Sequence, residues 1–172
     1  MSSLLVCGNV CCVAVKNDTF VIGQLRKRCN DCNPTTATTM EQTVIEVTQE
    51  VVRGLVGLDP PGGRRRFEGA YQIAVTVSRQ YQALLDQQVG LLAITDMDTA
   101  VQSFTAVLDA MFGCGPVNCG RVAVVVVFAG RVVQHCMTRR IITVDDVDRL
   151  SEAMGRHLAT RLISSQQSVV SI

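Results

Sequence analysis

The sequence has few aromatic residues and almost no excess of charge. Aromatics make up 4% of its 172 residues, tryptophan is absent, and only two histidines occur. A core with so few rings must consist mainly of aliphatic side chains, which favours helices packed on helices. The formal net charge of +1 gives no global attraction to nucleic acid or to a membrane surface, so we expect neither as a partner.

Sequence motifs of catalysis and nucleotide binding are also missing. His135 and His157 belong to no HExxH pattern, and neither a GxGxxG loop nor a Walker lysine occurs. No serine has the strand-turn-helix glycine setting of a nucleophile elbow. We therefore expect a protein that is not an enzyme and that needs no cofactor.

The most apolar segment of the chain is interrupted by charge before it could span a bilayer. Only nine uncharged residues separate Arg121 from Arg131, whereas a helix that spans a bilayer needs about 20. No basic region precedes the apolar residues 4–15, so a signal peptide is not expected. Residues 168–172 are too few for an anchor, so we expect a cytoplasmic chain with no C-terminal membrane anchor.

Cysteine, in contrast, is plentiful, with eight residues that crowd the start of the chain. Cys29 and Cys32 form a CxxC pair, which can chelate zinc or cycle as a dithiol, and Cys7 with Cys11 or Cys12 would complete four thiolates. A zinc ribbon needs a second CxxC at a regular spacing, and the sequence has none. A zinc or redox module in residues 7–32 is therefore an alternative interpretation, and the main one includes no metal.

Apolar residues recur at helical spacing in several segments of the chain. The predicted helices cover residues 39–58, 67–92, 95–112, 118–136 and 143–162. Thr39 and Gln42 form a capping box at the first start, and Thr95 and Thr143 are the N-cap candidates of the third and fifth helices.

The fourth of these segments is ambiguous between strand and helix. Val124 to Val127 and Phe128 favour a strand, because β-branched side chains lose rotamer freedom in a helix. The apolar run is roughly 16 to 18 residues long, however, which exceeds a usual strand. The charge of Arg121 at its start would be costly to bury without a partner. The side chain must therefore face a ligand or solvent in a cleft, or form an internal salt bridge, for which Asp109 is one candidate.

Helical periodicity is absent before Thr39. We therefore expect residues 1–38 to be a poorly ordered or non-helical extension, and residues 39–172 to form an all-α domain. A helix that is apolar all round must be covered all round, so the apolar segment should be the central helix of the bundle.

A family likeness is carried by the residues around this segment. Gly115-Pro116-Val117-Asn118-Cys119-Gly120-Arg121-Val122, followed by Phe128-Ala129-Gly130, resembles the first homology motif of the Bcl-2 apoptosis regulators. That motif reads Asn-Trp-Gly-Arg and continues into an apolar helix. The stretch before Asn118 has one residue more than the usual motif, as in the myeloid cell leukaemia (Mcl) branch. The segment from Gln42 to Arg53 is also most similar to that branch. The likeness covers about residues 39–165 and is strong from 94 to 136.

The resemblance implies a Bcl-like bundle with a surface groove for the amphipathic death-motif helix (the third Bcl-homology motif) of a pro-apoptotic partner. An arginine in the motif forms a salt bridge with an aspartate of that helix, and Arg121 has its position. The implied groove floor is Val107, Leu108, Met111, Val124, Val125 and Phe128, the implied wall is Val77, Tyr81 and Leu85, and Asn118 and Gly120 flank the arginine. One apolar helix face with one charge pair suits such recognition.

Three departures from the family pattern accompany this likeness. Cys119 replaces the motif tryptophan, and the chain's own death motif has Ala70 for leucine, Ala74 for glycine and Val75 for aspartate. The chain also ends before the second homology motif and the membrane tail, so we expect a bundle truncated at its C-terminal end.

The weak death motif favours an anti-apoptotic regulator that sequesters pro-apoptotic partners as heterodimers. A pro-apoptotic or decoy member of the family is the alternative. For localisation, the resemblance adds to the cytoplasmic expectation an association with the mitochondrial outer membrane through partners.

Overall fold

The computed structural model describes residues 35–113 and 117–170 of the chain. Its elements are α3 (Thr35–Leu55), the short 3-10 helix η2 (Pro61–Gly63), α4 (Glu68–Gln80), α5 (Gln82–Gly90), α6 (Met97–Gly113), α7 (Cys119–Thr138), the 3-10 helix η3 (Val144–Asp146) and α8 (Val147–Val170). Within the described ranges every regular element is a helix, so the prediction of an all-α fold is confirmed. The predicted zinc or redox module in residues 7–32 lies outside the described residues.

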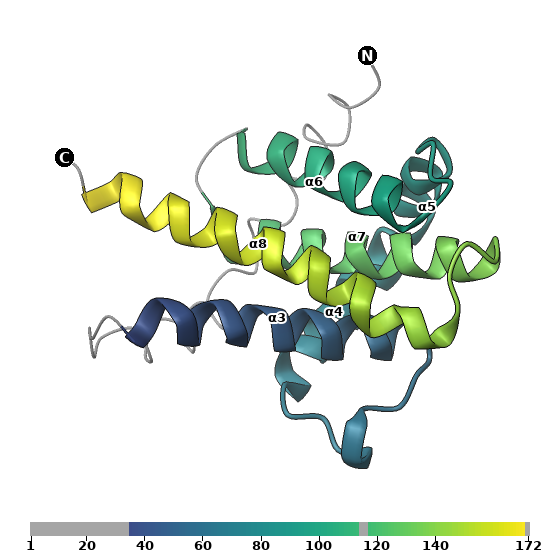
Figure 1. Cartoon of the computed structure of the whole chain (residues 1–172), viewed down its shortest axis with the longest axis horizontal. Helices are drawn as coiled ribbons and strands as arrows, with labels where there is room; N and C mark the ends of the chain where they lie inside the picture. The colour runs from purple at the N-terminus through teal and green to yellow at the C-terminus, as the bar shows by residue number, and fades with distance from the viewer. Residues whose placement is uncertain (1–34, 114–116, 171–172) are drawn as a thin grey trace.

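Helix α7 is the centre of the bundle. It packs against α3, α4, α5, α6 and α8, and the long helices α3 and α8 lie side by side along it (Figure 1). Every residue from Val124 to Gly130 is buried. The prediction of a central apolar helix is therefore confirmed.

The valine run adopts a helix in spite of its strand propensity. Val124, Val125 and Val127 are at most 1% exposed, so the apolar area that they bury outweighs the few tenths of a kcal/mol that each β-branched residue costs in a helix. Over its full 20 residues, α7 is long and apolar enough by composition to cross a membrane. Most of that apolar surface is covered by the other helices, as in the core helix of a soluble bundle.

Two glycines allow the long helices to approach one another closely. A Cβ atom on Gly155 of α8 would lie 3.1 Å from the Cα atom of Ile45 and 3.2 Å from the Cβ atom of Thr48, both in α3. On α7, a Cβ atom on Gly130 would lie 2.8 Å from a methyl carbon of Leu55. The absence of a side chain thus sets the spacing between α3 and its two neighbours.

The first predicted helix start is wrong. Helix α3 begins at Thr35, so Thr39 is an internal residue, and its carbonyl accepts a hydrogen bond from the hydroxyl of Thr43 (2.8 Å). Gln42 does not cap the helix but donates to Glu46 one turn later (3.1 Å). Helix α3 therefore begins four residues before the predicted start at Thr39.

The other predicted caps are close to the observed ones. Helix α6 is capped by Asp96, the residue after Thr95, whose carboxylate accepts the backbone N–H of Thr99 (2.8 Å). That hydrogen bond is the main reason why the pKa of Asp96 is lowered. Thr143 forms the predicted cap with Asp146, and this capping box opens the turn that leads into α8.

The predicted helix over residues 67–92 is kinked. Tyr81, with φ −112° and ψ 15°, separates α4 from α5. Tyr81 is joined to both helices by main-chain hydrogen bonds, from its N–H to Val77 O (3.0 Å) and from Leu85 N to its carbonyl oxygen (2.9 Å), but neither bond spans the kink. The chain therefore changes direction here without a loop.

Candidate partner-helix binding site

The predicted groove residues come from helices that meet on α7. Val107, Leu108 and Met111 lie on α6, Val124, Val125 and Phe128 on α7, Val77 on α4, Tyr81 at the kink, and Leu85 on α5. Helices α4, α5 and α6 each pack against α7, whereas direct contact between α5 and α6 is sparse. The structure thus brings the predicted floor and wall together around α7.

These residues are packed in a closed state. Leu108, Met111, Val124, Val125 and Phe128 of the floor, and Leu85 of the wall, are at most 2% exposed. Val107, Val77 and Tyr81 are half-buried and pack against the same core. Access for another helix would therefore require α4 and α5 to move away from α7.

Asn118 directly precedes α7 and caps that helix. Its backbone is extended (φ −135°, ψ 169°), and its side-chain oxygen accepts the backbone N–H of Arg121 (3.0 Å). An Asn at this position satisfies one of the amide groups that a helix start leaves without a partner. Asn118 therefore fixes where α7 begins and, with it, the first turn that carries Arg121.

Arg121 lies between the start of α7 and the end of α6. It is 8% exposed, and its Nη1 atom donates to the carbonyl oxygen of Met111 (3.2 Å) in the last turn of α6. A cation is favourable there because the carbonyl groups at a helix end carry partial negative charge. Asp109, the acid considered as its internal partner, has an oxygen 2.9 Å from Nε of Arg161 on α8.

Comparison with known families gives the chain an identity. Residues 71–167 match a family described as "Apoptosis regulator proteins, Bcl-2 family", and this match extends from the first turn of α4 into α8. The chain belongs to the Bcl-2 family. It is accordingly a regulator of apoptosis, in a family whose members regulate rather than catalyse. A search of curated proteins gives no match.

In this Bcl-2 family chain, the segment that resembles the first homology motif begins the central helix. Cys119, at the position of the motif tryptophan, is the first residue of α7 and is half-buried. Gly120 follows it in the first turn, also half-buried. Among the described residues, no group of three or more His, Cys, Asp and Glu side chains is arranged to hold a metal ion.

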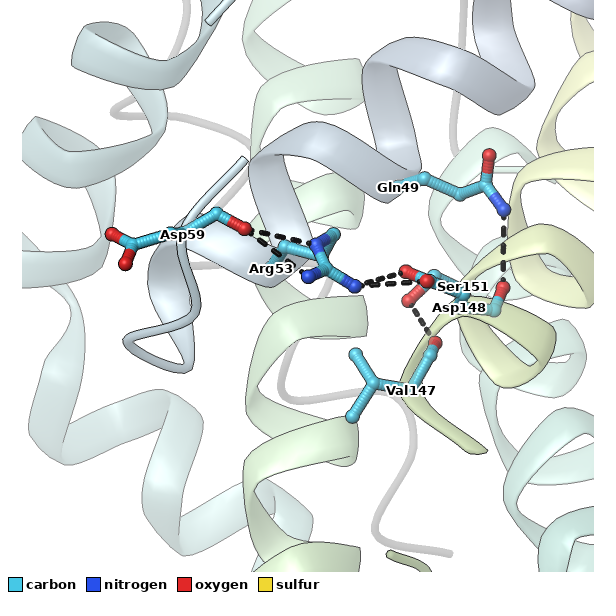
Figure 2. Close-up of polar contacts among 6 residues, drawn as sticks. All are labelled: Gln49, Arg53, Asp59, Val147, Asp148 and Ser151. Carbon is cyan, nitrogen blue, oxygen red and sulfur yellow. Dashed lines mark hydrogen bonds and ion pairs between the residues drawn. The ribbon is translucent and has the colours of Figure 1, made fainter. Parts of the chain in front are cut away.

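Sequence reasoning missed a second polar site, which joins α3 to the start of α8. Arg53 donates to both carboxylate oxygens of Asp148 (2.8 Å each) and to the carbonyl oxygen of Asp59 (3.1 Å), and Gln49 donates to the carbonyl oxygen of Asp148 (3.2 Å) (Figure 2). A pocket of about 270 Å³ lies beside it, lined also by Phe67. No local pattern points to this site, because Arg53 and Asp148 are 95 residues apart.

Glu50, which lines the same pocket, fixes the loop before α4. Glu50 is 9% exposed, and its carboxylate accepts the backbone N–H groups of Arg66 and Phe67. Arg66 in turn pairs with Glu46 (3.0 Å), and Arg65 stacks on the ring of Tyr71 (3.8 Å to the centroid). Two arginines of the basic run 64–66 thus have structural contacts, and the start of α4 is held firmly on α3.

Proposed function

We propose that this chain is an anti-apoptotic regulator that binds the death-motif helix of a pro-apoptotic Bcl-2 family partner. The proposed binding site is the groove formed when α4 and α5 move away from α7, with α6 on its other side. The observation that carries the proposal is the position of Arg121, a buried cation at the start of the central helix and beside the end of α6.

Arg121 has a neutral acceptor that a ligand carboxylate can replace. The carbonyl oxygen of Met111 binds a guanidinium less strongly than a carboxylate, because a carboxylate adds the attraction of a full negative charge and offers two oxygens for parallel hydrogen bonds. A carboxylate that reaches Arg121 would therefore compete well for its donors. This single charge pair would fix the register of an otherwise apolar helix.

The apolar part of the binding energy would come from the groove floor. Phe128, Val124 and Leu108 are now covered by the chain's own helices. A partner helix with apolar residues at i, i+3 or i+4, and i+7 would cover the same surface after α4 and α5 shift outward. Binding would thus select a more open conformation of the bundle.

The anti-apoptotic direction is supported by the chain's own death motif. Residues Ala70, Ala74 and Val75 of α4 lack the leucine, the glycine and the aspartate of that motif. A released α4 would be a poor ligand for another family member, so the chain is better suited to receive a helix than to donate one. The Mcl branch remains our proposed placement within the family, from the likeness of Gln42 to Arg53.

The site of action that we propose is the cytoplasm, with recruitment to the mitochondrial outer membrane through bound partners. A complex with a pro-apoptotic family member would be a heterodimer. Expression in cells with a death readout separates the directions, since a survival factor lowers cell death and a pro-apoptotic member raises it.

Titration with a fluorescent death-motif peptide tests the proposed site. We expect saturable binding to the wild-type chain, and Arg121→Ala should weaken it by about 2 to 5 kcal/mol, the range for removing one member of a buried charge pair. Arg156→Ala is the matched control, because Arg156 is an exposed arginine of α8 that pairs with Glu152 in its own helix. Urea unfolding of each variant confirms that it is folded.

The peptide supplies the second control. A peptide with asparagine in place of its aspartate should bind the wild-type chain weakly and should lose little more when Arg121 is replaced. Absence of saturable binding, or equal binding by Arg121→Ala and wild type, would refute the proposed site.

A further inference from the structure

Arg131 of α7 joins the central helix to both halves of the kinked wall. Its Nη1 atom lies 3.3 Å from an oxygen of Asp86 on α5, and its Nη2 atom donates to the hydroxyl of Ser78 on α4 (2.9 Å). Gln134, on the next turn of α7, accepts from Nη1 (3.2 Å) and orients the guanidinium. The Arg131 side chain is 14% exposed and Ser78 is buried, so the guanidinium and its contact with Ser78 lie inside the bundle, whereas Asp86 lies at the surface.

These contacts lie on either side of the kink at Tyr81. No proline or glycine occurs between residues 77 and 85, and proline, glycine or an inserted side chain are the usual local causes of a bend. Tyr81 has main-chain hydrogen bonds to Val77 O and from Leu85 N, but its φ of −112° and ψ of 15° are not helical, so the bend lies at a break between α4 and α5. The bend therefore depends on packing and on groups such as Arg131 that hold its two arms.

We propose that Arg131 is the positioning residue that keeps the wall formed by α4 and α5 closed on α7, and that it thereby sets the affinity of the groove for a partner helix. This inference rests on the proposed function. Arginine suits the task because its planar guanidinium offers several donors in a fixed fork, so one side chain can bind Asp86 and Ser78 at once. Lysine has a single ammonium group and cannot span both in the same geometry.

The closed wall lowers the apparent affinity for a partner. Leu85 and Val89 of α5 are at most 2% exposed, so α5 covers apolar surface that a ligand helix would need. A partner that binds only the open form has an apparent affinity reduced by the fraction of molecules that are open. Loosening Arg131 raises that fraction, which strengthens binding.

The expected size of the effect is modest. Asp86 is 52% exposed, and ion pairs with a solvent-exposed partner contribute little to stability. We expect Asp86→Asn to raise peptide affinity about two- to fivefold, the range that such a pair supports. The matched control is Gln87→Ala, the exposed neighbour on the same helix, for which we expect unchanged affinity.

Hydrogen exchange provides a readout that does not depend on the peptide. In Asp86→Asn and in Arg131→Lys, amide groups of α5 (82–90) should exchange faster, while those of α6 and α8 keep the wild-type rate. A general loss of stability would instead raise exchange in all helices. The double variant should show no further increase beyond the larger single effect, because both changes break one interaction.

The two proposals fail in different ways. Faster exchange confined to α5, together with tighter peptide binding, supports the role of Arg131. Unchanged exchange in α5, or weaker binding by Asp86→Asn, overturns it. If no peptide binds the wild-type chain, the proposed function fails. Faster exchange in α5 would then still show that Arg131 holds the wall, but the role of Arg131 in partner affinity would be refuted.

Discussion

Adding one methyl group at Gly155 or at Gly69 should change stability in opposite directions. Both glycines lie in helices, α8 and α4. At Gly155 a Cβ atom would lie 3.1 Å from the main chain of Ile45 in α3, whereas at Gly69 no atom lies within 4 Å of the added group. Gly155→Ala and Gly69→Ala therefore form a pair that differs chiefly in the space around the added methyl group.

The magnitudes follow from two terms. Alanine is favoured over glycine in a helix interior by about 1 kcal/mol, and by less near a helix end, so Gly69→Ala should gain about 0.5 kcal/mol. At Gly155, in a helix interior, the gain of about 1 kcal/mol is opposed by overpacking, which typically costs about 1 to 3 kcal/mol. The atom that must give way is main chain, which cannot rotate aside. We expect a net loss of about 1 kcal/mol for Gly155→Ala.

Urea unfolding followed by circular dichroism measures both variants. The midpoint should fall for Gly155→Ala and rise for Gly69→Ala, with unchanged slopes in both, since neither change alters the surface exposed on unfolding. For a domain of this size, 1 kcal/mol corresponds to a shift of about 2 to 4 °C in Tm. If Gly155→Ala is as stable as Gly69→Ala, then the close approach of α3 and α8 does not limit packing at this position, and the reasoning is wrong.

Two further predictions concern polar groups. Arg53→Ala should lower the free energy of unfolding by about 1 to 2 kcal/mol, because the contact with both oxygens of Asp148 is lost; a urea midpoint equal to wild type would contradict this. Burial, and then the charge of Arg139, lower the pKa of His135 from 6.5, so the folded chain disfavours the protonated ring. Stability should therefore fall as the pH drops below about 6.5, and His135→Gln should reduce this slope; parallel slopes would exclude His135 as the cause.

The sequence was sufficient to predict what depends on local pattern and burial. The central position of α7 could be predicted, because a segment from Val122 to Val133 with one charge must be enclosed. The start of α8 could also be predicted, since Thr143 and Asp146 form their capping box within four residues. In both cases the signal and the structure that it specifies lie in the same segment.

Features that depend on distant partners could not be predicted. The kink at Tyr81 has no local sign, because two of the contacts that hold it come from Arg131, about 50 residues later in the chain. Similarly, the sequence left open whether Arg121 would pair with an internal acid or face a cleft. In the structure, Arg121 donates a hydrogen bond to the carbonyl oxygen of Met111, an acceptor that neither alternative included. At Thr39 the capping signal was present but unused, since the helix had already begun at Thr35.

The central helix also has a consequence for how this chain folds. Four consecutive valines give α7 little tendency to form a helix alone, so the conformation of residues 119–138 depends on contacts from the other helices. We expect α7 to acquire its structure late, on a partly assembled bundle. Before that point, the run from Val124 to Phe128 is an uncharged segment of high β-propensity, and this makes it prone to aggregate during synthesis or after partial unfolding.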